Sequence, residues 1–536
     1  KEKLPVQLSE QIVNQTDGVP LFIEDVILSL LQSSQLSSGS LVDEKIAVPN
    51  KLSEHLMSRI DDLGESKQVA QLAAVIGREF SLFMLQALSN LTTSKLEMKI
   101  DRLVDAGLIL LSGRTEDQRY VFKHSMIRDA AYESLLISDR MELHSRIASW
   151  IETESAIQRQ TQPETIAYHY ELAGAFDLSV KYWLQAGQRS NNRSNYIEAS
   201  IQLKNAYRLN QKLIGSDERN RIELEIIIAL GVASAGAGGI SGEDAGKIYS
   251  KALSLCEALD YPAETFPVLA GAGSLHFIRS NYKISLEIAA QSILLANRKS
   301  NSTGLVIGKR IIGAVQCVTG KFSDADKSLS SAVHVYDKNP NFHRSYSPTY
   351  ALDHKTTALC YLGLTNISTS KIDLALTVSD QAVNHSKNID LHSQNCALCY
   401  QTAIRHLRND SANLIFDVAT RSLKLALDEG YASWVGMSRL LQGEAIIQLG
   451  HLEEGMNKIE NGVLEYSDVM AKTFLPLAQS VLAKGYMATN QYQKSLDVLL
   501  EAESLSIQTE QLWFLPEVQR LHAETLIGLE QYEAAH

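Results

Sequence analysis

One position recurs at long range through the C-terminal half of the chain. The interval is 40 residues, with one interval of 50, and the residue is most often aromatic or aliphatic. A fixed period of this length is typical of stacked supersecondary units. The recurring positions, called rungs below, are Tyr282, Phe322, Ile372, Ala412, Leu452, Tyr492 and Tyr532.

Small residues accompany each rung at fixed offsets. Nine positions before the rungs stand Gly273, Gly313, Gly363, Ala403, Gly443, Ala483 and Ala523. Residues three and ten positions after each rung are also small, with Ile415 as the exception, and they share one helix face because they lie seven apart. The pattern predicts pairs of closely packed antiparallel helices with the rung at the turn. Such pairs bury their apolar faces only by stacking, so we expect an α-solenoid with a concave surface.

The pattern resembles the tetratricopeptide repeat, whose usual period is about 34 residues. Upstream of the ladder, seven residues fall where that repeat places its large and small positions: Trp183, Leu184, Gly187, Tyr196, Ala199, Leu203 and Ala206. The longer period predicts helices longer by about a turn, as in the regulatory solenoids of large ATPases. We expect about nine repeats, the last of them truncated. The resemblance implies a binding function and names no ligand.

The N-terminal part has a different organisation. An apolar stripe from Leu21 to Leu31 follows the turn at Asp17–Pro20, and a polar linker precedes residue 51. Two β-prone runs, 108–111 and 119–122, flank a polar turn and predict a hairpin. Helices are predicted at 53–63, 66–76, 81–89, 94–106, 125–136 and 138–153. The predicted protein is mainly α: a helical lid remnant with linker (1–50), a winged-helix domain (51–155) and a tetratricopeptide-like solenoid (156–536).

Composition narrows the class of protein. Of the 536 residues, 45% are hydrophobic and 21% charged, as in ordinary globular proteins. A net charge of −12 argues against non-specific nucleic-acid binding, which needs clustered Lys and Arg. Five sparse cysteines suggest reduced thiols and hence the cytoplasm. No signal peptide or membrane span is predicted, and the chain is interpreted as a piece of a longer protein.

Several short segments carry a second resemblance. They are Asp17–Glu24, Val48–Leu52, Arg59–Leu63, Ala73–Phe80 and Phe122–Tyr132. In this order they resemble the lid and winged helix of bacterial signal-transduction ATPases with numerous domains (STAND), of the kind fused to class III adenylate cyclase domains.

The STAND resemblance implies roles for three residues. Gly18 and Pro20 would pack on the adenine, and His124 would contact the β-phosphate in the resting ADP state. The residue after the histidine is usually acidic in that class, whereas here it is Ser125. We expect Ser125 to cap a helix that begins at Met126. A structural role for each of the three residues stays open.

No catalytic site is predicted within the chain, so enzyme activity is left open. Gly246-Lys247 lacks the earlier glycine and the following Ser or Thr of a phosphate-binding loop. Cys396 and Cys399 have metal-ligand spacing without a second pair, which favours buried thiols. No cofactor is assigned to this chain, although the resemblance implies ATP or ADP with magnesium in the parent protein.

The longer interval between rungs contains an insertion rich in aromatic residues. Its candidates for partner contact are Phe342, His343, Arg344, Tyr346 and Tyr350. Aromatic and Arg side chains are frequent at interfaces, but the loop could equally pack on its neighbouring repeat.

Three functions remain open from the sequence. The chain is interpreted first as the sensor region of a signalling ATPase with a cyclase output, whose repeats bind a protein or small ligand. The alternatives are the same region of a transcription regulator with a DNA-binding output, or a free-standing repeat scaffold. We expect no nucleic-acid or membrane binding by this chain, and oligomerisation is left open.

Overall fold

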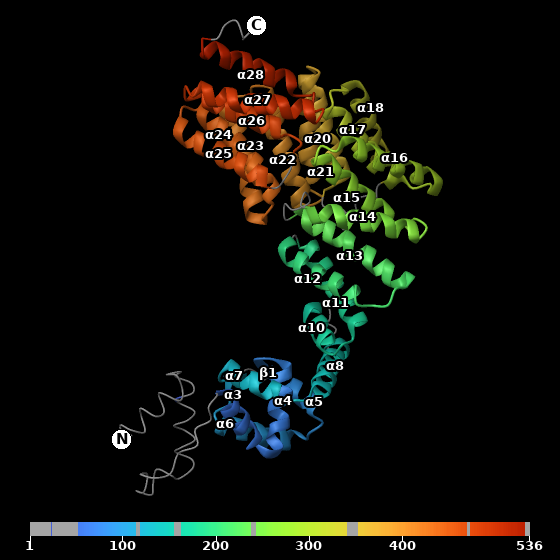
Figure 1. Cartoon of the computed structure of the whole chain (residues 1–536), viewed down its shortest axis with the longest axis vertical. Coiled ribbons are helices and arrows are strands. Elements are labelled where there is room, and N and C mark those ends of the chain that lie inside the picture. The colour runs from blue at the N-terminus through green and yellow to red at the C-terminus, as the bar shows by residue number, and fades with distance from the viewer. Residues whose placement is uncertain are drawn as a thin grey trace, which may run out of the picture. The chain divides into compact units, whose positions relative to one another are not determined.

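The computed structural model describes residues 52–113, 118–154, 162–193, 195–236, 243–339, 352–468 and 472–530, together with Ile23. The chain divides into two compact units, Lys1–Ser179 and Val180–His536. Figure 1 shows the helices of both units along the chain. The predicted domain limits at 50 and 155 differ from this division and stay a prediction.

The first unit combines helices with a small antiparallel sheet. Its helices are α3 (Leu52–Asp61), η1 (Gly64–Ser66), α4 (Lys67–Ile76), α5 (Leu82–Ser89), α6 (Thr93–Asp105), α7 (Ser125–Glu133), α8 (Ile137–Glu154) and α10 (Pro163–Leu172). Its strands are β1 (Glu79–Ser81), β2 (Ile109–Gly113) and β3 (Arg119–Phe122), in the order β1-β3-β2. The predicted helices and hairpin are present, and β1 is an addition that the sequence did not predict.

The core of the first unit lies between the helices and one face of the sheet. Leu56, Leu96, Ile109 and Phe122 are almost fully buried there. The apolar residues of α6 recur at Leu96, Ile100 and Leu103, so one helix face carries the contacts.

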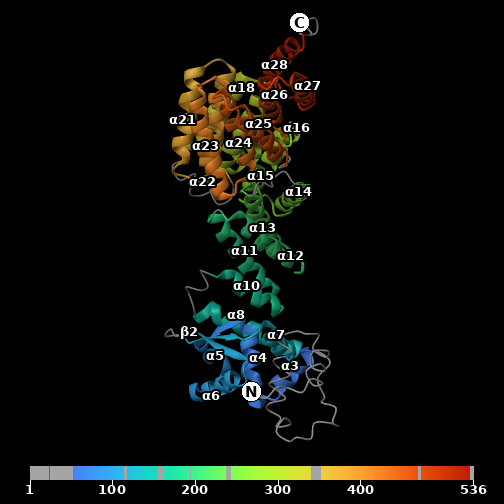
Figure 2. The ribbon, with the colours of Figure 1, turned by 90° about the vertical axis from the view of Figure 1, so that its left-hand side faces the viewer.

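The second unit is a stack of helix pairs, as Figure 2 shows. Its helices are α11 (Phe176–Asn192, which begins in the first unit), α12 (Tyr196–Asn210), α13 (Asp217–Gly236), α14 (Glu243–Ala258), α15 (Thr265–Ile278), α16 (Tyr282–Lys299), α17 (Ser302–Val318), α18 (Phe322–Asp337), α20 (His354–Ser368), α21 (Ile372–Ser386), α22 (Leu391–Leu407), α23 (Ala412–Glu429), α24 (Ala432–Gln448), α25 (Leu452–Asp468), α26 (Leu475–Ala488), α27 (Tyr492–Gln508) and α28 (Leu515–Gly528). Each described rung opens the second helix of its pair. The mainly α, tetratricopeptide-like fold is therefore confirmed.

Small residues bring the two helices of a pair into contact, as predicted. The Ser285 hydroxyl on α16 donates to the Gly273 carbonyl of α15 at 2.8 Å. The approach is closest between α24 and α25, where a Cβ added to Gly443 would lie 2.7 Å from the Gly455 carbonyl oxygen. Backbone therefore meets backbone at this pair, which only glycine permits.

The first helices of successive pairs form a layer of their own, here called the first-helix layer. It comprises α15, α17, α20, α22, α24, α26 and α28, each in contact with the next. Nearly every residue of α20 and α22 is buried. The part of the concave surface that these two helices were expected to supply is thus covered by other residues of the second unit.

The second unit also closes on itself through pairs that are distant in sequence. The Thr473 hydroxyl donates to the Phe277 carbonyl at 2.7 Å, and the Trp513 amide donates to the Val318 carbonyl at 3.2 Å. Each bond joins two repeats that stand five positions apart. One turn of the superhelix therefore takes about five repeats.

Within the described part of the chain, no helix combines the length and apolarity needed to cross a bilayer.

Candidate functional site

His124 lies between strand β3 and helix α7. Its backbone is extended (φ −137°, ψ 146°), and it occupies the N-cap position of α7 without a side-chain cap bond. The prediction that Ser125 is the cap is wrong by one residue, because Ser125 already belongs to the helix and is exposed. The histidine ring, and not a serine hydroxyl, therefore stands at the helix start.

The His124 ring leaves one nitrogen available for a ligand. Its Nε2 atom is buried and has no hydrogen-bond partner among the described residues. The first turn of α7 contains no acidic residue, so the positive end of the helix dipole is not compensated there by a carboxylate of its own. A buried imidazole nitrogen beside a helix N-terminus suits an oxygen of an anion such as a phosphate.

The other residues predicted for a site cannot be placed. Gly18 and Pro20 lie outside the described residues. So do Phe342, His343, Arg344, Tyr346 and Tyr350 of the insertion. Their proposed roles stay predictions, and His124 is the one described member of the nucleotide set.

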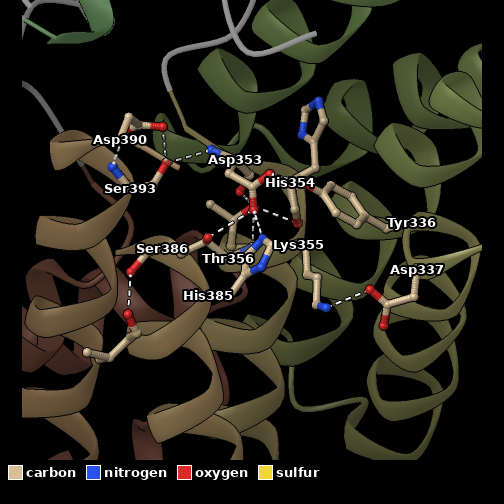
Figure 3. A network of polar contacts seen from close by, with 12 residues as sticks. Tyr336, Asp337, Asp353, His354, Lys355, Thr356, His385, Ser386, Asp390 and Ser393 are labelled. Atoms are coloured by element: carbon tan, nitrogen blue, oxygen red, sulfur yellow. Dashed lines mark hydrogen bonds and ion pairs between the residues drawn. The ribbon is translucent and has the colours of Figure 1, made fainter. Parts of the chain in front are cut away.

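A buried polar network follows the insertion, at the start of α20 (Figure 3). The Asp353 carboxylate accepts hydrogen bonds from the Tyr336 hydroxyl at 2.7 Å and from the Thr356 amide at 2.7 Å. The His385 ring lies 3.0 Å from the same carboxylate. Burial alone would raise the pKa of Asp353, but the hydrogen bond and charge of His385, with the bonds from Tyr336 and Thr356, lower this pKa to about 2.

The same network ties Asp353 to the next repeat. The Asp353 amide donates to the Ser393 hydroxyl at 2.9 Å, and that hydroxyl donates to the Asp390 carboxylate at 2.9 Å. Sequence reasoning missed this set; the N-cap pattern of Asp353 and Asp390 before their helices was the available signal.

The Asp–His arrangement does not build a hydrolytic triad. The nearby Ser386 hydroxyl is fully buried and donates to the backbone carbonyl of Val383 at 2.9 Å. With the serine hydrogen committed to the backbone, no activated nucleophile faces His385. The network instead fixes the end of the insertion against helices α18, α21 and α22.

A row of charges crosses the first-helix layer from α22 to α28. His406 lies 2.5 Å from Glu444, and Lys484 lies 3.8 Å from Glu444 and 3.6 Å from Glu517. Burial would raise the pKa of Glu444, but the charges of His406 and Lys484 lower it. The exposed fraction rises from 7% for Glu444 to 26% for Lys484 and 51% for Arg520, so the row opens to solvent toward α28.

Aromatic side chains fill the first-helix layer beside this row. Phe474 stacks on Tyr361 with ring centroids 6.4 Å apart and meets Trp513 at 5.6 Å. Its backbone has φ +70°, a conformation that bulky residues rarely adopt. The packing around it holds that strained conformation in place.

The cysteines contribute no site. All five are free and buried, as expected for structural thiols. Burial raises the pKa of Cys399 to about 12, which keeps it in the unreactive thiol form. Among the described residues, no group of three or more His, Cys, Asp or Glu side chains could hold a metal ion.

Comparison with known proteins gives one sequence relative. The chain is 24% identical over 522 residues to an uncharacterized protein of Rhizobium meliloti (strain 1021), covering 94% of this chain and 49% of that protein. The chain thus spans about half the length of the curated relative it matches. No protein-family model matches the chain.

Solved structures with a similar arrangement are repeat proteins. One is a STAND protein with a tetratricopeptide repeat sensor from Pyrococcus horikoshii, at 13% identity over 99% of this chain and 62% of that chain, with a TM-score of 0.31. Another is a Rap protein complexed with competence and sporulation factor, at 10% identity over 66% of this chain and 94% of that chain, with a TM-score of 0.46. Scores of this size leave the function to other evidence.

Proposed function

We propose that this chain is the sensor region of a multidomain signalling ATPase of the STAND class. Its repeats bind a protein or small ligand and control a nucleotide switch that lies in another part of the parent protein. The observation that carries the proposal is the buried, unpartnered Nε2 atom of His124 at the start of α7, in the unit that precedes the repeats.

The order of elements supports a winged-helix assignment for residues 51–155. Helix α4, strand β1, helices α5 and α6, and the hairpin β2–β3 follow one another as in that domain. Its role here would be structural: it presents His124 to the nucleotide. ATP or ADP with magnesium would be bound mainly by residues of the parent outside this chain.

On the repeat side, two groups of residues are candidate partner contacts. The row of charges from Glu444 to Arg520 offers both signs within reach of solvent, which suits a polar or charged partner. The insertion residues Phe342–Tyr350 are the second candidate, from sequence alone. A ligand acts on the switch only if it binds the ADP and ATP states with different affinity.

The STAND resemblance also motivates an adenylate cyclase as the output of the parent protein. A cyclase domain with two metal-binding Asp residues before Lys1 would support this output. A helix-turn-helix after the repeats would instead indicate a transcription regulator.

The experiment is ADP release from the full-length protein. His124→Ala removes the imidazole from the proposed β-phosphate contact, and we expect ADP to leave about tenfold faster and basal output to rise. His334→Ala is the matched control, because His334 is exposed on α18, far along the sequence from α7. Equal release rates for His124→Ala and the parent protein would refute the phosphate contact.

A further inference from the structure

Helices α7, α8 and α10 are joined by a continuous chain of side-chain hydrogen bonds. The Tyr132 hydroxyl on α7 lies 3.0 Å from Nε2 of His144 on α8. Nδ1 of His144 lies 2.8 Å from Nδ1 of His169 on α10. Both histidines are buried, with exposed fractions of 2% and 3%.

The chemistry of this chain restricts its protons. Two ring nitrogens in contact need one donor and one acceptor, so exactly one of the two Nδ1 atoms carries a hydrogen. If His144 donates at Nδ1, its Nε2 accepts from the Tyr132 hydroxyl. If His169 donates, His144 carries its hydrogen at Nε2 and donates to the Tyr132 oxygen. The state of the Tyr132 bond therefore sets the direction of the His144–His169 bond.

Both rings are neutral near pH 7. Burial lowers the pKa of His144 to about 4. Burial, with the neighbouring His144, lowers the pKa of His169 to about 3. The chain is therefore a neutral hydrogen-bond relay, and a charged ring does not arise in the physiological range.

The surroundings keep the relay in place. The Arg140 guanidinium lies over the Tyr132 ring, 4.9 Å from its centroid. The Tyr168 ring meets the His144 ring edge-on at 6.3 Å. On α10, the Tyr170 hydroxyl donates to the Glu152 carboxylate of α8 at 2.5 Å, a second polar tie between these two helices.

We propose that the Tyr132–His144–His169 relay couples helix α7, which begins beside His124, to helix α10, the first helix in the range predicted for the repeats. The inference rests on the proposed function for its regulatory meaning, because α7 carries the proposed phosphate contact. The coupling itself is a property of this chain and can be tested without nucleotide.

The first test is hydrogen exchange on the 536-residue chain. Tyr132→Phe removes one hydroxyl at unchanged ring volume, and we expect amide exchange to rise about threefold or more in both α7 and α10. His169→Leu should have the same reach in the opposite direction. In the double variant, the combined increase should fall well below the product of the single increases, because either change alone already breaks the relay.

Tyr168→Phe is the matched control, since its side chain touches His144 but is 52% exposed and holds no hydrogen bond in the relay. It should leave exchange in α7 unchanged. Increases confined to the substituted helix, or a double variant that shows the full product, would overturn the coupling.

The second test asks whether the coupling reaches the nucleotide in the full-length protein. Tyr132→Phe should change ADP release by about threefold or more, and Tyr168→Phe should not. If His124→Ala alters release while Tyr132→Phe does not, the regulatory role of the relay is wrong and the proposed function stands. If His124→Ala has no effect, the phosphate contact fails, and the exchange test still decides whether the relay couples α7 to α10.

Discussion

Gly443→Ala should destabilise the pair α24–α25, although alanine favours helices. The added Cβ would lie 2.7 Å from the Gly455 carbonyl oxygen and 3.0 Å from the Ile459 amide nitrogen. Ordinary contact begins at 3.4 Å, so α24 must withdraw from α25 by roughly 0.7 Å (3.4 − 2.7). A gap of that size forfeits a quarter to a half of the dispersion energy of the atoms facing it.

The size of the effect follows from two opposing terms. Replacing glycine by alanine inside a helix gains about 1 kcal/mol. Forcing extra volume into a packed interface costs about 1–3 kcal/mol, and the upper part of that range applies because backbone atoms are the obstacle. We expect a net loss of about 1–2 kcal/mol, measured as a lower thermal midpoint and faster amide exchange in α24 and α25.

Gly363→Ala is the matched control at the same repeat position. Its added Cβ would meet only the terminal Ile404 Cδ1 atom at 2.6 Å, and the nearest backbone atom lies at 3.7 Å. A flexible methyl group can turn away, and Ala403 and Ala483 already occupy this position in other repeats. Stability should stay within about 0.5 kcal/mol of the parent chain. Equal effects of the two substitutions would refute the argument from backbone contact.

Three further predictions concern polar groups. Thr473→Val removes the bond to the Phe277 carbonyl and should destabilise the second unit by about 1 kcal/mol, with faster exchange at both ends of that contact; no change in exchange would contradict the closure. Unfolded histidines bind protons below pH 6.5 before His144 and His169 do, so stability should be constant above that pH and fall by about 2 kcal/mol for each at pH 5 in a denaturant series; a flat profile would count against their burial. Asp353→Asn removes the charge that faces His385 and should cost about 2 kcal/mol in thermal unfolding, whereas an unchanged midpoint would show the network to be dispensable.

The repeat fold could be predicted because its signal is local and repeated. Each described rung begins a second helix, and the small residues beside it meet across the pair, as Ser285 and Gly273 do. The boundaries of the first-unit helices were also predictable, since apolar periodicity and turn residues mark them.

Contacts between distant repeats could not be predicted. Thr473 and Phe277 are 196 residues apart, and nothing in either local sequence specifies the other. The curvature that brings them together is the sum of small rotations between successive pairs. The same holds for the relay, because His144 and His169 are ordinary helix residues until the fold places their rings in contact.

The candidate site was predictable only in part. A resemblance singled out His124, and the structure places its ring at the start of α7. The sequence put the cap on Ser125, because serine is the commoner capping residue. The extended backbone that follows strand β3 puts His124 at the N-cap instead.

Nucleotide affinity tests the central claim most directly. ADP should be titrated calorimetrically into the 536-residue chain and into the full-length protein under the same conditions. If this chain is the sensing arm of a switch whose phosphate loop lies elsewhere, the full-length protein should bind ADP at least about a hundredfold more tightly than the chain. Submicromolar ADP binding by the chain alone, or equal affinities, would contradict the account.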